Sequence, residues 1–458
     1  MEKLVICDNI ILDENRDLWI EQCRAQQLVE QYGTPLYVTS ERQIRENYRQ
    51  IRDAFCAVYP KTLVMCAMKA NNNMALRHIL SDEGAGGEAF GPGELIALLE
   101  SGADPRKCVL NGGYKEDYEL ILAVGRGVRI NADSYKEVQD IERVASTLGK
   151  KADVRLRLRL QVPEFDEIPA QAGGRTISER FANSKFGLSP EQVLKCAEYI
   201  KGSEHMVLTG YSFHLGRQSL DTQHFAFVLR EMANVAHMVY NELGIEARVL
   251  NIGGGIPSSS RDPEGHGTSG SVPQLSEYAA AMAGAIRKAV SEGKLTQEPV
   301  FELEPGRGVA GSAAVLLTKT MLYKENLGHR WMLVDCGGNQ LSRIDSAHYA
   351  YRAVKATHSS EALACAPTVV DIVGNLCSAD FLVRDVEIQD PGQGDLIAIL
   401  DAGMYAETTA SQFNGRPRPA TVLVHGDKSD VIKRRETFRD VFATQCIPAR
   451  IEQMCDGE

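Results

Sequence analysis

Short apolar runs alternate with longer amphipathic stretches over most of this chain. Apolar runs of four to eight residues are typical of buried strands, and apolar residues at helical spacing are typical of helices. Eight strands are predicted, at Thr62–Ala67, Gly86–Ala89, Lys107–Leu110, Val128–Asn131, Asp153–Leu160, Val207–His214, Ala247–Ile252 and Pro299–Leu303. Helices are predicted at Glu41–Cys56, Pro92–Ser101, Tyr135–Leu148, Pro190–Ile200, Thr222–Leu243 and Gln274–Glu292.

This alternation indicates the α/β class. Eight strands with helices between them favour a parallel (β/α)8 barrel, although the same alternation permits a doubly wound open sheet. Two long insertions, Pro163–Ser184 and Pro257–Val272, are rich in Gly, Ser, Pro and charge. Both follow predicted barrel strands, so we expect them to be loops on the active face.

The pattern changes after about residue 310, where strand-like runs follow one another with few helical stretches. These runs are Ala314–Tyr323, His329–Val334, Thr368–Gly374, Leu396–Leu400 and Thr421–His425. They predict a separate, mostly antiparallel β domain, and the strand-like opening segment Leu4–Trp19 is expected to join it. The predicted division is a barrel over residues 38–311 and a β domain made of residues 1–37 and 312–458.

Composition narrows the setting. The chain has 458 residues, 44% hydrophobic and 24% charged, which is typical of a globular protein of two domains. A net charge of −11 disfavours nucleic-acid and anionic-membrane partners. The 11 cysteines show no CxxC pair or metal-type spacing, so no metal site is expected. With early acidic residues and no bilayer-length apolar stretch, a reducing cytoplasm is the expected location.

Candidate chemistry gathers at the predicted strand ends. Lys69 ends the first barrel strand, Glu88 the second, His214 the sixth, and Glu304 follows the eighth, while glycines 253–255 follow the seventh. Each has an ordinary alternative: a lysine that extends into solvent, a salt-bridged glutamate, a packed histidine, a tight turn. Taken together, an amine, a flat aromatic ring, a carboxylate and a glycine turn suited to an anion describe a pyridoxal phosphate site.

Ordered motifs along the whole chain carry a family resemblance. They are CAMKANNN (66–73), GGEAFGPGEL (86–95), NADSYKEV (131–138), NSKFG (183–187), SFHLGRQ (212–218), NIGGG (251–255), EPGR (304–307), CSAD (377–380), DAGMY (401–405) and FNGRPRPATVLV (413–424). The chain resembles the barrel-type, alanine-racemase-like pyridoxal phosphate enzymes, and most of all the diaminopimelate/ornithine decarboxylase family. The last motif resembles diaminopimelate decarboxylases in particular.

The resemblance implies roles for individual residues. Lys69 would bond covalently to the cofactor, His214 would stack on its ring, and Cys377 would return a proton to the substrate carbon from a second subunit of a homodimer. The further residues implied to bind the cofactor are Glu88, Arg217, Gly254, Gly255, Glu304, Gly306, Arg307 and Tyr405. The residues implied to contact the substrate are Arg307, Arg343, Ser378 and Tyr405.

Four positions depart from the family pattern. Cys66 replaces a tyrosine, Glu88 an aspartate and Arg217 a serine. The fourth departure is the loop after Cys377, which is one residue shorter and lacks the acid that binds a distal ammonium in the family. Asp380 and Glu407 stay open as replacements for that acid.

The expected function is a pyridoxal phosphate-dependent decarboxylase that removes the α-carboxylate of an amino-acid centre in a substrate with a distal carboxylate. Either meso-diaminopimelate, giving lysine, or a larger carboxylated conjugate of siderophore or antibiotic biosynthesis fits the resemblance. A barrel-type amino-acid racemase is one rival. The other is a non-catalytic family member, which the presence of Lys69, His214, Glu304 and Cys377 disfavours.

Overall fold

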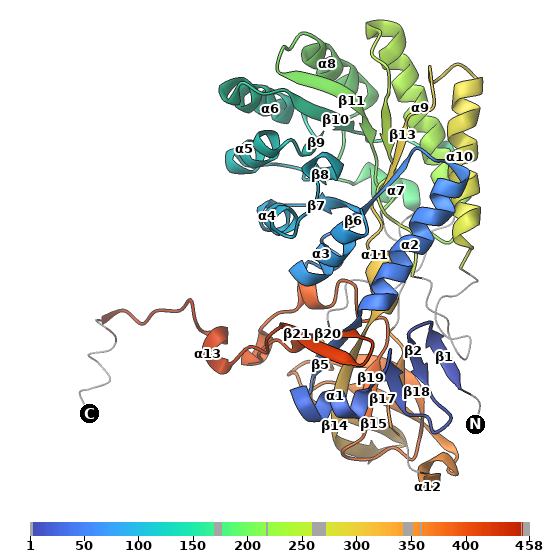
Figure 1. Cartoon of the computed structure of the whole chain (residues 1–458), viewed down its shortest axis with the longest axis vertical. Helices are drawn as coiled ribbons and strands as arrows, with labels where there is room; N and C mark the ends of the chain where they lie inside the picture. Colours follow the sequence, from blue (N-terminus) through green and yellow to red (C-terminus); the bar gives the residue numbers. More distant parts are fainter. Residues whose placement is uncertain are drawn as a thin grey trace.

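The computed structural model describes residues 3–168, 176–216, 219–258, 272–341, 351–357, 360–449 and 451 (Figure 1). Eight parallel strands close into a barrel in the order β10-β11-β12-β13-β6-β7-β8-β9. They are β6 Thr62–Ala67, β7 Gly86–Ala89, β8 Cys108–Leu110, β9 Arg129–Ala132, β10 Ala152–Arg157, β11 Met206–Ser212, β12 Val249–Asn251 and β13 Val300–Leu303. The predicted barrel is therefore confirmed, and closure of the sheet rules out the open doubly wound alternative.

Helices cover the outside of the barrel. They are α2 Glu41–Val58, α3 Met74–Asp82, α4 Pro92–Glu100, α5 Asp117–Arg126, α6 Tyr135–Leu148, α8 Pro190–Lys201, α9 Gln223–Leu243 and α10 Leu275–Ser291. Side-chain caps fix where several of them begin, because a cap accepts a backbone N–H that has no partner inside the helix. Ser40 caps α2 through the N–H of Gln43, and Asn73 caps α3 through the N–H of Ala75.

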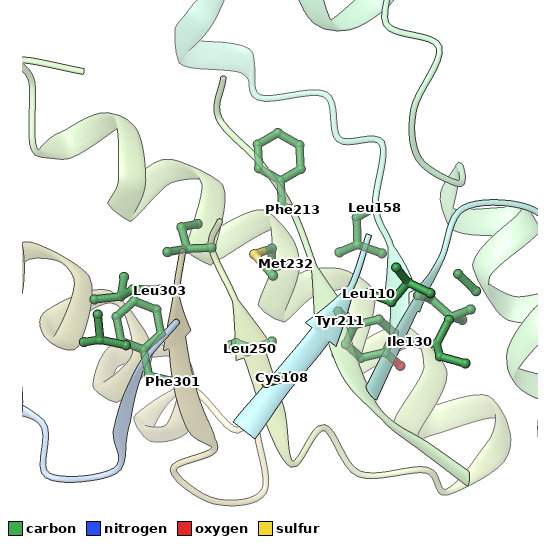
Figure 2. Packing of buried hydrophobic residues seen from close by; sticks show 14 of the residues in the cluster. Cys108, Leu110, Ile130, Leu158, Tyr211, Phe213, Met232, Leu250, Phe301 and Leu303 are labelled. Atoms are coloured by element: carbon green, nitrogen blue, oxygen red, sulfur yellow. The ribbon is translucent and has the colours of Figure 1, made fainter. Parts of the chain in front are cut away.

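The barrel strands send alternate side chains outward into an apolar layer and inward into a polar core. Phe301 and Leu303 on β13 belong to the main hydrophobic cluster, which includes Met232 on α9 (Figure 2). Glu302, between them, accepts hydrogen bonds from Arg129 on β9 and Arg155 on β10. Because β13 is not a neighbour of either strand in the sheet, these contacts cross the inside of the barrel.

A second, larger sheet forms the lower part of the molecule in Figure 1. Its path is β18-β17-β15-β14-β5-β20-β21; β19 pairs with β14, and β16 pairs with β19. The strands are β5 Leu36–Ser40, β14 Ala314–Asn326, β15 His329–Val334, β16 Ala353–Lys355, β17 Pro367–Val373, β18 Phe381–Gln389, β19 Leu396–Ile399, β20 Ala420–His425 and β21 Lys428–Lys433. Pairing is antiparallel except for β15 with β17 and β5 with β20, so the predicted mostly antiparallel domain is confirmed.

The opening segment forms its own small sheet of β1 Leu4–Cys7, β2 Ile10–Leu12, β3 Leu18–Ile20 and β4 Cys23–Arg24, followed by α1 Ala25–Tyr32. Its apolar residues share a hydrophobic cluster with strands of the large sheet. The remaining helices are short: α7 Ile177–Ala182, α11 Arg307–Ala310, α12 Ser360–Leu363 and α13 Phe438–Val441. In the described chain, none of the helices combines the length and the apolar character that a membrane crossing requires.

The described parts of the first insertion, residues 163–168 and 176–184, pack onto the barrel strand that leads to His214. Phe165 is fully buried, and its ring lies against Phe181 of α7, whose ring meets Phe213 edge-on at 5.3 Å. Arg230 of α9 forms an ion pair with Glu164 beside it. Most of the second insertion, residues 259–271, lies outside the described residues.

Candidate active site

Lys69 lies just past β6, and its amine is held by Glu88 at the end of β7. The Nζ atom donates to Glu88 Oε2 at 2.5 Å, and the Glu88 side chain is fully buried. Burial lowers the pKa of Lys69, but attraction to Glu88, Glu304 and Tyr405 outweighs it, so the pKa is raised. Burial alone would favour the neutral amine, but the neighbouring carboxylate favours the ammonium form.

Glu304 follows β13 and faces the same group. Its carboxylate accepts hydrogen bonds from Asn251 Nδ2 at 2.8 Å and from Asn111 Nδ2 at 3.1 and 3.2 Å. Burial, together with the charge of Glu88, raises its pKa to about 7, while Lys69 and the two amides act in the opposite direction. The fold therefore holds this carboxylate near the point where it exchanges a proton at neutral pH.

His214 follows β11 and lies beside the glycine turn after β12. A side chain at Gly253 would come within 3.0 Å of His214 Nδ1 and 2.8 Å of the Phe213 carbonyl. Burial, then the charges of Lys69 and Arg157, lower the pKa of His214 to about 3. The ring is therefore uncharged at neutral pH, which suits a flat ring that stacks on another.

A glycine-lined cradle lies next to these groups. An added Cβ would fall 2.7 Å from the Ala70 Cβ and 3.2 Å from the Tyr405 hydroxyl at Gly306, and 2.7 Å from the Glu304 carbonyl at Gly254. Gly255 has φ of +109°, which side chains rarely adopt. Only glycine fits these positions, and glycine lets the backbone N–H groups approach an anion closely beside the Tyr405 hydroxyl.

The β domain supplies Tyr405 and closes one side of the site. The Tyr405 N–H donates to the Ala70 carbonyl at 2.7 Å, and the Thr408 hydroxyl donates to the Lys69 carbonyl at 3.0 Å. The Arg307 guanidinium, at the start of α11, lies 5.4 Å from the centre of the Tyr405 ring. An amine, a paired carboxylate, a neutral flat ring and an anion cradle are the donor set that pyridoxal phosphate requires, so the residues present fit this cofactor.

Cys377 lies on an exposed loop of the β domain, and Ser378 beside it is exposed as well. In the described part of the chain, Cys377 forms hydrogen bonds with Asn414 and none with Lys69, Glu88 or Glu304. The Cys377 N–H donates to Asn414 Oδ1 at 3.2 Å, and Asn414 Nδ2 donates to Cys377 Sγ at 3.5 Å. Arg217 and Arg343, two of the predicted site residues, lie outside the described residues.

Sequence reasoning missed three residues of this site. Asn111, directly after β8, and Asn251, on β12, are buried amides in otherwise apolar strands, and that contrast was the available signal. Arg157, at the end of β10, lies 3.8 Å from Asp133 and over the Phe186 ring. Its positive charge acts on His214, and nothing in its local sequence distinguished it from the other arginines of that strand.

Comparisons with known proteins agree with this geometry. The sequence profile described as pyridoxal-dependent decarboxylase, pyridoxal binding domain, matches residues 41–311. The diaminopimelate decarboxylase of Methanothermobacter thermautotrophicus is 33% identical over 453 residues, which cover 97% of this chain and 99% of the relative. That of Archaeoglobus fulgidus is 32% identical over 94% of this chain and 97% of the relative.

Solved structures give the same result. The crystal structure of a diaminopimelate decarboxylase from Methanocaldococcus jannaschii in complex with L-lysine has a TM-score of 0.87 and 29% identity, covering 97% of this chain and 99% of that one. The enzyme from Helicobacter pylori, also with L-lysine, has a TM-score of 0.77 and 26% identity, covering 94% and 99%. These likenesses identify an enzyme, a carboxy-lyase similar to diaminopimelate decarboxylases, with pyridoxal phosphate as cofactor. The chain belongs to the family of pyridoxal-dependent decarboxylases.

Proposed function

We propose that this decarboxylase removes the α-carboxylate of an amino acid whose far end carries a second carboxylate. The observation that carries the proposal is the Lys69 amine, held by Glu88 beside Glu304 and the glycine cradle, in a chain similar along its length to diaminopimelate decarboxylases. Arg307 beside Tyr405 supplies a guanidinium, the side chain best suited to bind a carboxylate.

The cofactor would be held by residues from both domains. Lys69 would bond to its aldehyde, His214 would lie on its ring, and Glu304 would hold its ring nitrogen. The residues that would surround its phosphate are Gly254, Gly255, Gly306, Arg307, Tyr405 and Arg217. When bound, the cofactor supplies an electron sink that accepts the electron pair left behind as carbon dioxide departs.

Three residues of the chain would carry out the proton transfers of the reaction. Glu88 Oε2, at 2.5 Å, can accept the proton that Lys69 Nζ must lose before its nitrogen bonds to an aldehyde. Glu304, as a carboxylate, would keep a proton on the ring nitrogen that it faces. Cys377 Sγ would return a proton to the substrate carbon from the second subunit of a homodimer, which is why it faces outward in a single chain.

The contacts of Asp380 and Glu407 bear on what the distal end of the substrate carries. Asp380 accepts from the N–H groups of Gly338 at 2.8 Å and Leu376 at 3.1 Å, so it holds its own loop together. Glu407 is buried, accepts from the Thr421 hydroxyl and lies 3.7 Å from Lys433 Nζ. Both acids already have partners within their own subunit, which favours a larger carboxylated conjugate over meso-diaminopimelate within the same substrate class.

A substrate panel tests the proposal. Purified enzyme would be given meso-diaminopimelate and carboxylated conjugates of amino acids, and carbon dioxide release would be measured against Lys69→Ala as the inactive control. We expect the fastest release from a conjugate. Efficient turnover of meso-diaminopimelate alone would contradict the conjugate, and turnover only of amino acids without a distal carboxylate would contradict the whole proposal.

We also propose a domain division and a cellular location for this protein. The barrel over residues 38–311 and the β domain of residues 1–37 and 312–458 would act as two domains of one subunit, supported by the hydrogen bonds that join Tyr405 and Thr408 to the Lys69 segment. A cytoplasmic location is supported by 11 cysteines without a paired motif.

A further inference from the structure

Asn111 donates hydrogen bonds to two acids of the site, although it lies in none of the motifs described above. It is buried, and its Nδ2 donates to Glu88 Oε1 at 3.0 Å and to the Glu304 carboxylate at 3.1 and 3.2 Å. A primary amide carries two N–H bonds on one nitrogen. One nitrogen therefore serves two acids, the first paired with Lys69 and the second facing the place of the ring nitrogen.

The orientation of this amide is fixed from behind. Asn131, on β9, donates from Nδ2 to Asn111 Oδ1 at 2.7 Å, so the oxygen of Asn111 is occupied and its NH2 end points at the acids. Asn251 holds Glu304 from the other side, at 2.8 Å. A continuous chain of hydrogen bonds therefore runs from Asn131 through Asn111 to Glu88 and Lys69.

Asn111 lies among several charged groups besides the two acids that it joins. Lys69 is the cation in contact with Glu88, and Arg157 adds a more distant positive charge to both acids. Glu302 adds a negative charge through Asn251, 3.4 Å away, and is itself paired with two arginines, Arg129 and Arg155. The two active-site acids repel one another, and a hydrogen-bond donor shared between them offsets part of that repulsion.

We propose that Asn111 is a positioning residue, which holds the carboxylates of Glu88 and Glu304 at a fixed separation, and so prepares the lysine and the ring-nitrogen partner together for the cofactor. This inference rests on the role proposed for Glu304. It assigns Asn111 a role that acts through its hydrogen bonds to the two acids.

Cofactor binding provides the test, without substrate. Pyridoxal phosphate would be titrated into cofactor-free Asn111→Leu, which removes both donors at similar volume, from pH 6 to pH 9, and absorption above 400 nm would be followed. We expect the dissociation constant to rise at least about tenfold, the value of a lost hydrogen bond to a charged group. We also expect the pH at which binding is tightest to move upward, since Glu304 ionises less readily.

Two further variants keep the test decisive. Asn111→Ser retains a donor with a single hydrogen, which serves only one acid, and should fall between wild type and Asn111→Leu. Tyr211→Phe removes a buried barrel hydroxyl that has no hydrogen bond within the described chain, and should bind the cofactor within about twofold of wild type. The melting temperature of each cofactor-free variant reports whether it folds.

Three results would overturn the inference. The first is wild-type affinity and pH profile in Asn111→Leu or, if that variant does not fold, in Asn111→Ser. The second is an equal loss in Tyr211→Phe, which would indicate general loosening of the barrel. The third is unchanged affinity in Glu304→Gln, which would remove the role on which the inference rests. Absence of turnover in the substrate panel, by contrast, would contradict the proposed substrate and would not affect these measurements of cofactor binding.

Discussion

At the scale of single residues, the barrel converts ordinary side chains into groups with unusual proton affinities. Glu304 and His214 are both surrounded by protein, and burial disfavours the charged form of each. For the acid this raises the pKa, and for the base it lowers the pKa. Both shifts make the stability of the cofactor-free protein depend on pH, in ways that variants can isolate.

Glu304→Gln should show the acid's contribution. The pKa of Glu304 is about 7 in the folded protein against 4.5 for an ordinary glutamate. The folded state binds the proton more tightly, so this stabilisation is complete below about pH 4.5 and is lost as pH rises through about 7. From pH 5 to pH 8, urea unfolding should show stability shifting in favour of the variant by about 1–3 kcal/mol. Parallel curves for the two cofactor-free proteins would contradict this.

His214→Phe should reveal the opposite slope. The pKa of His214 is about 3 when folded against 6.5 ordinarily, so the unfolded chain takes up a proton that the folded state refuses. The stability of wild type, relative to the variant, is full above about pH 6.5 and falls as the pH drops. Between pH 7 and pH 5 the difference should change by about 2 kcal/mol, measured by the same unfolding experiment. A variant as acid-sensitive as wild type would argue against a buried neutral ring.

At the scale of elements, three strands are joined by an ion cluster inside the barrel. Glu302 on β13 is fully buried and pairs with Arg155 on β10 and Arg129 on β9. Because these strands are separated in the sheet, the cluster ties opposite walls of the barrel together beneath Glu304. A buried charge that loses its partner is strongly destabilising, whereas replacing the whole group by apolar residues is often neutral.

Glu302→Gln should therefore destabilise the protein by about 3–5 kcal/mol, because two buried arginines lose their counter-charge. The denaturant midpoint of the cofactor-free protein measures this. The triple variant Glu302→Met, Arg129→Met, Arg155→Met is the matched control, since it removes all three charges and should recover much of the loss. A cost below about 1 kcal/mol for the single change would show that the cluster is hydrated rather than closed.

At the scale of the whole molecule, the two domains meet at Lys69, and the loop with Cys377 stays exposed. If that thiol serves a second subunit, each active site of a homodimer needs residues from both chains. Lys69→Ala and Cys377→Ala should then each be inactive alone. After the two are unfolded together and reassociated, half of the dimers are mixed and hold one intact site, so about one quarter of wild-type activity should return. No recovery in a sample whose mixed dimers are confirmed by mass would contradict the shared site.

The strands of the barrel were predicted more completely from the sequence than the strands of the β domain. Barrel strands such as Thr62–Ala67 and Gly86–Ala89 were predicted to the residue. For Thr62–Ala67 the reason is that a strand covered on both faces is a nearly continuous apolar run. Four strands of the β domain, β5, β16, β18 and β21, were not predicted. β16 is only three residues long. The sequences of β18 and β21 alternate with exposed charges, and β5 is a five-residue run that becomes a strand only by pairing with β14 and β20.

The sequence by itself determined the cofactor class and predicted the residues that would hold it, since Lys69, His214, Glu304 and the glycine turns each lie in a short local motif. Only the tertiary structure decided how these groups act on one another. Asn111, Glu88 and Glu304 come from three different strands, and their shared hydrogen bonds exist because the barrel closes. The same closure places Glu88 on Lys69 and makes that amine more basic, where desolvation alone would have made it less so. The physical reason is that proton affinity depends on distances between charges, and those distances are set by the fold and not by the spacing along the chain.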